Sequence, residues 1–406
     1  SLTIKNFFRQ LLNDNIQLKK FIHTFAPTKK FGIMITVEKI TFPNKIKDFI
    51  DFPHELYKGD PNYVPEIYLG QKDLLNPKKH PFYEHSKAQL FLAYKDGKLV
   101  GRIAAIKNGN HIKFSGNNDG FFGFFECIED YEVAKKLFDV ATEWVKKEGL
   151  TNIIGPTSIS TNEIFGWHID AFDLPPMMSM GYNKPYYSKF AEQYGFAKKI
   201  DFYAYYVTSE QVSEKALRVS EAFEGRLKTK GITIRPVNMK KFTEEAEKAH
   251  VVFNSAWEKN EAFVPMTKNE FMHLCKDMKQ IMDPELCLVA ESEGKIVGFS
   301  FSFPDINQVL KDVKKGRLLP TGIFKLLFGR GKIDKMRVVV LGVIEGYRKL
   351  GIEACFYAKT IKTGRAKGIN AAEASLILET NEMMNQALIN INAQVYKTYR
   401  LYQRTV

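Results

Sequence analysis

Apolar and polar positions follow one order of elements that occurs twice along the chain. Apolar runs with a period of two predict strands, and runs with a period near 3.6 predict helices. In the first half these elements lie at 35–41 (strand), 44–57 (helix), 89–107 (hairpin), 120–126 (strand), 129–149 (helix), 151–156 (strand), 183–196 (helix) and 201–207 (strand). In the second half they lie at 232–237 (strand), 240–260 and 268–282 (helices), 286–303 (hairpin), 336–343 (strand), from 347 (helix), 371–378 (strand), from 381 (helix) and 395–403 (strand). The two hairpins turn at Asp96-Gly97 and Glu293-Gly294, and the repeat predicts two copies of one architecture.

The repeat and the length of 406 residues predict two domains, because one core rarely serves a chain of this size. The expected parts are a basic amphipathic extension at 1–32, an N-terminal domain at 33–209, a polar linker helix at 210–231 and a C-terminal domain at 232–406. Each domain should hold a central mixed sheet flanked by helices, which is an α/β (α+β) fold.

Cysteine spacing and hydropathy indicate the compartment. The four cysteines occur singly in apolar runs, without the paired spacing of a disulfide framework or a zinc site. No stretch approaches the ~20 apolar residues that cross a bilayer. We therefore expect a cytoplasmic protein that uses no metal.

The net charge of +13 is concentrated in two segments. Residues 1–30 hold six Lys or Arg against one Asp, and residues 308–337 hold nine against two. The second segment, a basic insertion at 308–336, also carries Leu318, Leu319, Ile323, Phe324, Leu326, Leu327 and Phe328. Two interpretations stay open: packing on the body of the protein, or peripheral contact with an anionic membrane or a long acyl chain. Neither segment interleaves cations with stacking aromatics, so a nucleic-acid partner is not expected.

A strand passes directly into a helix at 343–354, with the sequence VIEGYRKLGIEA. A helix start presents free backbone N–H groups and the positive end of its dipole, which suit phosphate oxygens. Arg348 and Lys349 add positive charge, and Gly351 lets a ligand approach the backbone. These features predict an anion site at the start of this helix. The alternative is a helix start that binds no ligand.

The matching stretch of the first half is acidic. It contains Glu126, Glu129, Asp130 and Glu132. Carboxylates at a helix start stabilise its dipole but would repel a phosphate. The sequence therefore predicts an anion site in the C-terminal half alone.

Residues 337–385 resemble the coenzyme A-binding core of the GCN5-related N-acetyltransferase (GNAT) superfamily. Its pyrophosphate loop has the form R/Q-x-x-G-x-G/A. Arg348 and Gly351 match the first two positions, whereas Glu353 stands where Gly or Ala is usual.

The resemblance extends to the helix that follows the next strand, since Asn381 and Met384 match its Asn-x-x-Ala/Met start. The whole chain also resembles a family of bacterial proteins of about this length, with blocks such as GFFGFFE, GPTSISTNE and YKTYRLY. The resemblance implies two tandem GNAT-like domains and an N-acyltransferase. It also implies an acetyl-CoA or longer acyl-CoA donor, bound in the C-terminal domain at this anion site. The expected donor contacts are Gly342, Val343, Arg348, Lys349, Leu350, Gly351, Ile352 and Asn381.

Transfer of an acyl group to an amine needs a base for the ammonium proton. The strand at 336–343 carries no acid, which leaves Glu373 and Glu379 on the next strand as candidates. Six residues apart, they share one face of a regular strand. Glu379 is preferred because it ends the strand beside Asn381.

An acid for the thiolate leaving group is harder to identify. The superfamily often uses a Tyr on the last helix, and the matching position here is Leu388. Tyr399, together with Tyr396 and Tyr402 on the terminal strand, is the substitute, with core packing as the alternative role.

A polar block at 155–170 directly follows a strand, where loops tend to carry function. The predicted acceptor contacts are Asn162, Glu163, His168, Asn183 and Tyr186. His168 could act as a base or make a structural hydrogen bond. The expected acceptor is a small-molecule or lipid amine, bound in the cleft between the domains.

A rival interpretation is a non-catalytic protein that keeps this fold as a membrane-associated or ligand-binding module. Leu388 and Glu353 favour it, since they depart from the catalytic pattern. Peripheral membrane contact would then involve 1–30 and 308–337.

Overall fold

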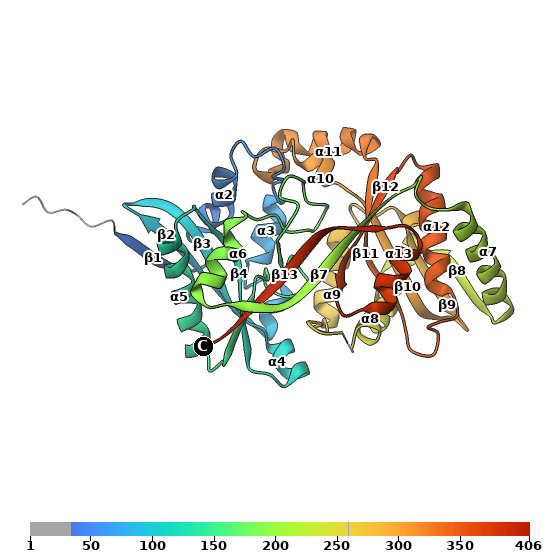
Figure 1. Ribbon diagram of the computed structural model, residues 1–406, viewed down its shortest axis with the longest axis horizontal. Helices are drawn as coiled ribbons and strands as arrows, with labels where there is room; N and C mark the ends of the chain where they lie inside the picture. The colour runs from blue at the N-terminus through green and yellow to red at the C-terminus, as the bar shows by residue number, and fades with distance from the viewer. Residues whose placement is uncertain (1–33, 259) are drawn as a thin grey trace, which may run out of the picture.

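The computed structural model describes residues 34–258 and 260–406, with the two halves of the chain side by side along its long axis (Figure 1). The basic extension expected at 1–32 lies outside these residues. Within the described ranges, no helix has both the length and the apolar character needed to cross a membrane.

The first half contains the elements expected from its pattern. Its strands are β1 (Ile35–Ile40), β2 (Lys87–Lys95), β3 (Lys98–Lys107), β4 (Asp119–Cys127), β5 (Asn152–Gly155), the short β6 (Trp167–His168) and β7 (Ala197–Thr208). Its helices are α2 (Ile46–Leu56), α3 (Tyr68–Leu74), α4 (Gly109–Ser115), α5 (Tyr131–Lys147) and α6 (Tyr186–Tyr194), with a 3-10 turn η1 (Pro81–Glu84).

The second half begins with the expected linker helix, α7 (Glu214–Thr229). Its strands are β8 (Ile232–Pro236), β9 (Cys287–Ser292), β10 (Lys295–Pro304), β11 (Lys335–Val343), β12 (Ala371–Leu378) and β13 (Gln394–Thr405). Its other helices are α8 (Phe242–Ala256), α9 (Lys268–Met278), α10 (Asn307–Leu310), α11 (Ile323–Gly329), α12 (Ile352–Ala366) and α13 (Glu382–Asn390). Both hairpins turn as predicted, because Asp96-Gly97 and Glu293-Gly294 have positive φ at both positions.

One continuous sheet runs through both halves in the order β1-β2-β3-β4-β5-β13-β7-β12-β11-β10-β9-β8. The two 12-residue strands, β7 and β13, cross its centre (Figure 1). The sequence order assigns β13 to the second half, yet β13 pairs with β5 of the first half. In turn β7, the last strand of the first half, pairs with β12 of the second. The halves thus exchange their last strands, which joins them through backbone hydrogen bonds.

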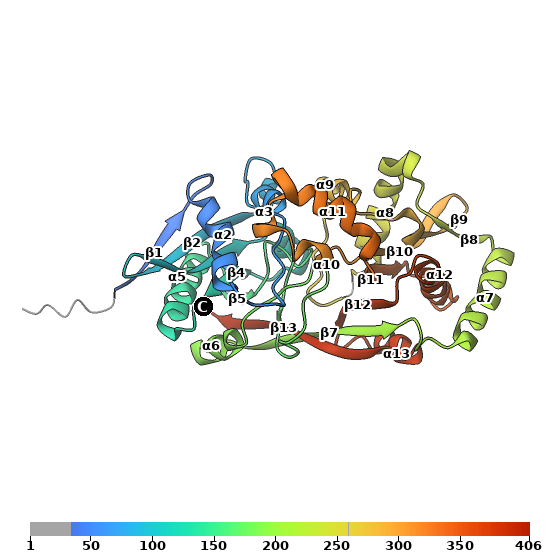
Figure 2. The ribbon, with the colours of Figure 1, turned by 90° about the horizontal axis from the view of Figure 1, so that it is seen from above.

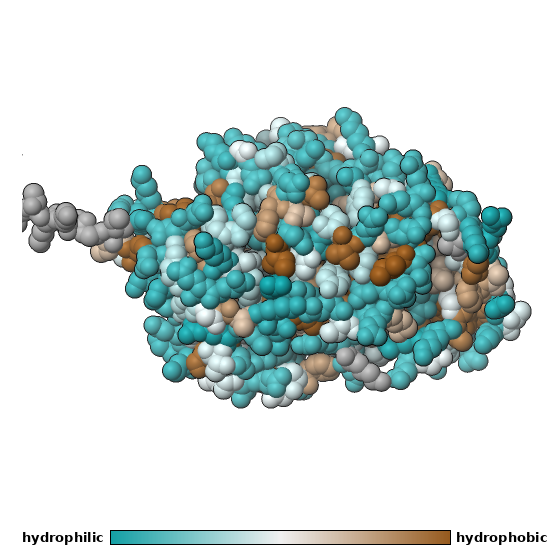
Figure 3. Space-filling model, in the orientation of Figure 1, coloured by the Kyte–Doolittle hydropathy of each residue, from teal (hydrophilic) through white to brown (hydrophobic). Residues whose placement is uncertain are grey.

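Helices cover both faces of this sheet (Figure 2). In the first half α5 packs on one face with α6, and α2 and α3 pack on the other. In the second half α8 and α9 cover one face, and α12 covers the other with α7. The surface seen in Figure 3 is mostly hydrophilic, with hydrophobic residues in small groups.

Candidate active site

The parallel strands β11 and β12 separate part-way along their length. Within the described residues their pairing runs from Lys335 and Ala371 and ends at Val338 and Ala374. Beyond Ala374 the backbone also shifts its register against β7. An opening forms there, and both 339–341 of β11 and 375–378 of β12 line a cavity.

The equivalent place in the first half is filled by the chain itself. β4 and β5 pair over Asp119–Phe121 and Asn152–Ile154, after which the backbone turns back over β4. The Thr157 N–H donates to the Phe122 carbonyl at 2.8 Å. A Cβ on Gly123 would lie 1.4 Å from the Thr157 oxygen, so only glycine fits there.

The two halves also differ where a helix follows the fourth strand of each. Helix α12 has Gly351 as its N-cap, which makes no side-chain cap hydrogen bond, and Glu353 lies in its first turn. Helix α5 is capped by Asp130, whose carboxylate accepts a hydrogen bond from the Glu132 N–H at 3.0 Å. The N-cap of α12 therefore leaves backbone N–H groups more open to an anion than the N-cap of α5, where a carboxylate already accepts a hydrogen bond.

Arg348, predicted to face a phosphate, instead holds the loop together. Its Nε donates to the Val343 carbonyl at 3.0 Å, and its Nη2 donates to the Ala256 carbonyl at 2.9 Å. The side chain thus ties the loop before α12 to the end of α8. The neighbouring Lys349 is exposed, so its ammonium is free to meet a ligand in solvent.

Other residues of the predicted anion site are packed. Gly342 and Val343 are buried in β11, and Ile352 is buried at the start of α12. A Cβ on Gly342 would lie 2.3 Å from the Trp257 ring, which stands over the strand. Leu350 is partly buried. These positions would therefore contact an acyl donor through their backbone N–H and carbonyl groups.

Replacing Gly351 by alanine should lower the free energy of unfolding by about 1–3 kcal/mol. Gly351 has φ 92°, and its added Cβ would lie 2.6 Å from the Phe223 ring of α7. Gly346→Ala is the matched control, since Gly346 has φ 91° but nothing within 4 Å of that position. Urea unfolding of both variants separates backbone strain from the clash. Equal losses would mean that the contact with Phe223 contributes nothing.

The opening continues into a cavity of about 950 Å³ that both halves line. Most of the wall is apolar. Its large apolar side chains include Phe165, Met178, Met180, Phe253, Trp257, Phe271, Phe299 and Phe301. Such a wall suits a hydrocarbon chain.

One part of the cavity wall is acidic. Glu163 lines it from the loop after β5, and Glu66 and Asp277 line it as well. Burial, followed by the charges of Glu66, Asp277 and Glu270, raises the pKa of Glu163 to about 7. No hydrogen-bond partner of the Glu163 carboxylate lies among the described residues. Carboxylates in an apolar cavity suit a cationic amine, and a carboxyl that titrates near neutrality suits proton transfer.

Glu126 is a second cavity residue whose pKa burial raises to about 7. Its carboxylate accepts hydrogen bonds from the hydroxyls of Tyr57 at 2.9 Å and Tyr187 at 2.6 Å. The guanidinium of Arg102 lies 4.0 Å from its other oxygen. These three partners give Glu126 a structural role, and Glu163 is the freer base.

Of the two predicted bases, Glu373 is fully buried beside the cavity. It forms an ion pair with Arg337 at 3.5 Å and accepts hydrogen bonds from the hydroxyls of Ser375 and Tyr396. Arg337 and Ser375 line the cavity, but Glu373 does not. Tyr399 is buried nearby, and its hydroxyl has no partner among the described residues.

Glu379 lies outside the cavity. Its carboxylate pairs with Lys198 at 2.8 Å and accepts a hydrogen bond from the Asp201 N–H at 3.0 Å. A register shift after Ala374 separates it from Glu373, so the two glutamates do not share a strand face as expected. Asn381 does line the cavity, and its side chain caps α13 by accepting from the Met384 N–H at 3.2 Å.

Some of the predicted acceptor residues line the cavity and others do not. Asn162, Glu163 and Asn183 line the cavity. His168 is buried: its Nδ1 donates to the Asp170 carbonyl at 2.9 Å, and its Nε2 accepts from the Asn183 N–H at 3.2 Å. Burial lowers the pKa of His168 to about 4, so it is neutral and already hydrogen-bonded. Tyr186 donates to the Cys127 carbonyl at 2.8 Å, away from the cavity wall.

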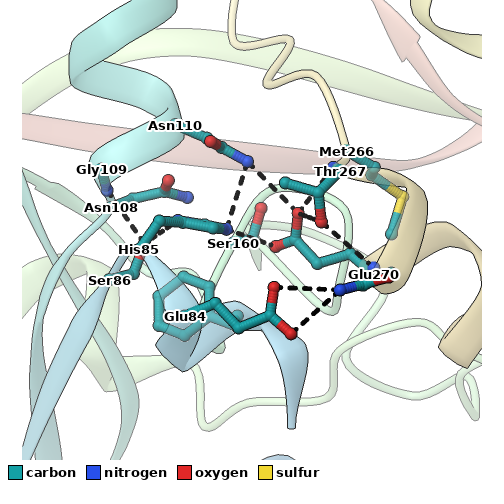
Figure 4. Close-up of polar contacts among 12 residues, drawn as sticks. Glu84, His85, Ser86, Asn108, Gly109, Asn110, Ser160, Met266, Thr267 and Glu270 are labelled. Carbon is teal, nitrogen blue, oxygen red and sulfur yellow. Dashed lines mark hydrogen bonds and ion pairs between the residues drawn. The ribbon is translucent and has the colours of Figure 1, made fainter.

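A polar network fastens the two walls of the cavity to each other (Figure 4). Glu270 of α9 lies 3.2 Å from His85, and Asn110 donates to Glu270 at 3.2 Å. Glu270 also forms the capping box of α9 with Thr267. In the loop after β5, Asn162 donates to the Val264 carbonyl at 3.0 Å. Glu163 is therefore held on a loop that both halves fix.

Two groups of cavity residues were not predicted from the sequence. Tyr357 of α12 lines the opening, and its hydroxyl lies 3.0 Å from the Met384 sulfur on α13. Leu388, where a Tyr acid was sought, is buried. Tyr357 follows Glu353 by four residues and so faces the same side of α12, which was the one available signal. Glu66 and Asp277 lie far from Glu163 in the sequence, and no motif indicated that they would line the same cavity.

Among residues 34–258 and 260–406, no three His, Cys, Asp or Glu side chains are grouped so that they could hold a metal ion.

Comparison with known proteins finds two relatives along almost the whole chain. No protein-family model matches. Protein YghO of Escherichia coli (strain K12) is 35% identical over 381 residues, which cover 90% of this chain and 95% of the relative. Bacterial ceramide synthase of Caulobacter vibrioides (strain NA1000 / CB15N) is 32% identical over 383 residues, which cover 92% of this chain and 98% of the relative.

Two solved structures are similar in fold. A tandem GNAT protein from the clavulanic acid biosynthesis pathway has a TM-score of 0.55 at 9% identity, covering 92% of this chain and 98% of that chain. A GCN5-related glucosamine N-acetyltransferase region of a fungal multi-domain β-N-acetylglucosaminidase has a TM-score of 0.51 at 12% identity, covering 92% of this chain and 38% of that chain. At these identities a structural likeness shows the fold alone.

Proposed function

The chain belongs to the tandem GNAT-fold family that contains Protein YghO and bacterial ceramide synthase, and from this premise we propose that it is an acyl-CoA-dependent N-acyltransferase of a long-chain amine. The tandem GNAT fold expected from the sequence is confirmed. The donor, the acceptor and the residues that act on them are the proposed part.

The relative from Caulobacter supports the choice of acceptor. A ceramide is the amide of a long-chain amino alcohol and a fatty acid, and the chain aligns with 98% of that synthase. A long-chain amine has an ammonium head and a hydrocarbon tail. The cavity offers a matching pair of surfaces, with Glu163, Glu66 and Asp277 in a wall that is mostly apolar.

One observation carries the proposal: a single cavity of about 950 Å³ joins the opening between β11 and β12 to Glu163. A donor whose phosphates meet the uncapped start of α12 could place its acyl arm in that opening. An acceptor bound in the same cavity would then have its amine near a carboxyl with a pKa of about 7.

The chemistry follows from these positions. Glu163 takes a proton from the ammonium group, and the free amine attacks the thioester carbonyl. The new C–N bond forms and the C–S bond breaks; the nitrogen gives up its second proton as the amide forms, which balances the proton that the leaving thiolate takes up. Tyr357, whose pKa burial raises, remains protonated at neutral pH and is the proposed donor of that proton. Arg348 shapes the loop, while Lys349 and the backbone of 349–352 hold the donor phosphates.

The test is amide formation by the purified chain with palmitoyl-CoA and sphinganine. The expected result is release of free thiol together with an N-palmitoyl product, identified by mass spectrometry, and dependence on both substrates. Glucosamine is the matched acceptor control, because it offers an amine without a hydrocarbon tail and should not be acylated.

Absence of an amide product would overturn the proposal. In that case a rise in melting temperature with palmitoyl-CoA alone would favour the rival interpretation of a ligand-binding module. Acylation of glucosamine at a comparable rate would contradict the long-chain acceptor.

A further inference from the structure

The insertion between β10 and β11 exposes several large apolar side chains within ten residues of chain. Leu319 is 75% exposed and Phe328 is 80% exposed, and Phe324 and Leu327 are each more than half exposed. Leu69 of α3 in the first half is exposed to a similar degree. We call these five residues the apolar surface. Monomeric proteins rarely leave so many large apolar side chains in water close to one another.

Exposed cations accompany the apolar surface. They are Lys311, Lys314, Lys325, Arg330 and Lys332. None of the five forms an ion pair with a carboxylate among the described residues. Unpaired cations beside apolar side chains match a partner with anionic groups above a hydrocarbon layer.

The insertion is fastened to the first half and forms a fixed surface. Lys315 pairs with Glu55 at 2.7 Å, and Arg317 pairs with Asp51 at 2.9 Å. Gly316 has φ 62°, and a Cβ there would lie 1.8 Å from the Glu66 carbonyl oxygen. These contacts use two of the cations of the insertion for anchoring, whereas the apolar side chains stay outside.

The apolar surface adjoins the cavity. Leu69 belongs to both, and Leu310 and Leu318 of the insertion line the cavity wall. Viewed from above, α10 and α11 lie over the junction of the halves (Figure 2). Arg330 donates to the Gln280 carbonyl just after α9 at 2.7 Å, and Arg317 lies over the Tyr68 ring of α3. A partner seated on this surface would therefore lie next to the mouth of the cavity.

We infer that the apolar surface and its cations dock the protein on an anionic lipid bilayer, from which the lipid amine reaches the cavity. This inference rests on the proposed function for the identity of the substrate. The docking itself rests on the exposed residues and their charge. Lys325 and Arg330 each donate to a backbone carbonyl, of Asp312 and Gln280, and none of the five cations forms an ion pair among the described residues. A protein partner would explain the apolar side chains, but these exposed cations on the same insertion favour phospholipid headgroups.

The test is co-sedimentation of the full chain with phosphatidylcholine vesicles that do or do not contain phosphatidylglycerol. We expect binding to the anionic vesicles. The triple variant Leu319→Ser/Phe324→Ser/Phe328→Ser should lower the partition coefficient at least about tenfold, since three apolar side chains no longer enter the interface. Lys325→Glu/Lys332→Glu should remove the preference for phosphatidylglycerol.

Met383→Ser/Ile389→Ser on α13 is the matched control. Both side chains are more than half exposed, and α13 lies away from α11 in both ribbon views. The control variant should bind vesicles like the unmodified protein. Failure of the unmodified protein to bind, or binding by the triple variant at the unmodified level, would overturn the inference. So would a change of oligomeric state in the triple variant without any change in vesicle binding.

Activity in detergent micelles separates the two proposals. The triple variant should acylate micellar sphinganine at the unmodified rate, because its substitutions lie outside the cavity. Loss of vesicle binding with intact micellar activity is the expected result. Vesicle binding without any amide formation would overturn the proposed function and leave the docking standing.

Discussion

Replacing Glu163 by glutamine should lower kcat/KM for amide formation by about 10²–10⁴-fold, the usual contribution of a positioned base. Glutamine keeps the size and polarity of the side chain but cannot accept the ammonium proton. Binding of palmitoyl-CoA should be unchanged, because the donor is proposed to bind at the opening in the second half. Steady-state kinetics and a donor-dependent thermal shift measure the two effects.

The same substitution should not lower the melting temperature at pH 8. The folded pKa of Glu163 is about 7, above its ordinary value of 4.5, so the folded state holds this proton more tightly than the unfolded state. The contribution of the carboxyl to stability is therefore present at low pH and is lost as pH rises from about 4.5 to about 7. Glutamine carries no charge, so the variant avoids the free-energy cost of a buried, ionised carboxylate at pH 8. A structural role for Glu163 would instead give a lower melting temperature.

The value of kcat/KM should depend on pH, because only the ionised carboxylate of Glu163 can accept the ammonium proton. As pH rises through about 7, Glu163 loses its proton, so kcat/KM should increase and then level off. In Glu163→Gln this limb of the profile should disappear. If kcat/KM still rises through pH 7 in the variant, another group is responsible for the rise. Glu126, whose pKa is also about 7, would then be the next candidate.

Glu379→Gln is the matched control for this experiment. Glu379 is the base that the sequence favours, but it pairs with Lys198 outside the cavity. Its replacement should change kcat/KM by no more than a few fold. A loss comparable to that of Glu163→Gln would contradict the assignment of the base to the first half.

The difference between the two helix starts could be predicted from sequence because it depends on neighbouring residues. Gly351 before α12 and Asp130 before α5 are local signals, and the structure has them as N-caps of those helices. The exchange of β7 and β13 could not be predicted in this way. Order along the chain does not determine which strands pair, and either terminal strand has the length and pattern to fill either place.

The base proposed here could not be singled out from the sequence for a similar reason. Glu163 owes its raised pKa to burial and to carboxylates as distant in sequence as Glu66 and Asp277. Glu379 was favoured by its place beside Asn381, a purely local argument. Burial and the charges around a carboxyl depend on the folded arrangement, so motif spacing cannot rank candidate bases.

The exchange of strands brings a buried ion pair to the junction of the two halves. Arg337 of β11 donates to the Met178 carbonyl of the first half at 3.1 Å and to the Ser375 hydroxyl at 2.9 Å. Its partner Glu373 accepts a hydrogen bond from Tyr396 of β13. Burial lowers the pKa of Arg337, but the charge of Glu373 opposes that effect. Each charge is tolerated there because the other is present.

Arg337→Met should therefore lower the free energy of unfolding by about 3–5 kcal/mol, because it leaves Glu373 as an unpaired buried charge. Glu373→Gln should also destabilise the protein, since it leaves the guanidinium unpaired. The double variant should recover much of the loss, because a neutral pair of similar size carries no desolvated charge. Urea unfolding of the four proteins gives the coupling energy, and a value of about 1–3 kcal/mol is expected for groups in contact. Additive losses in the double variant would mean that the two side chains contribute separately to stability.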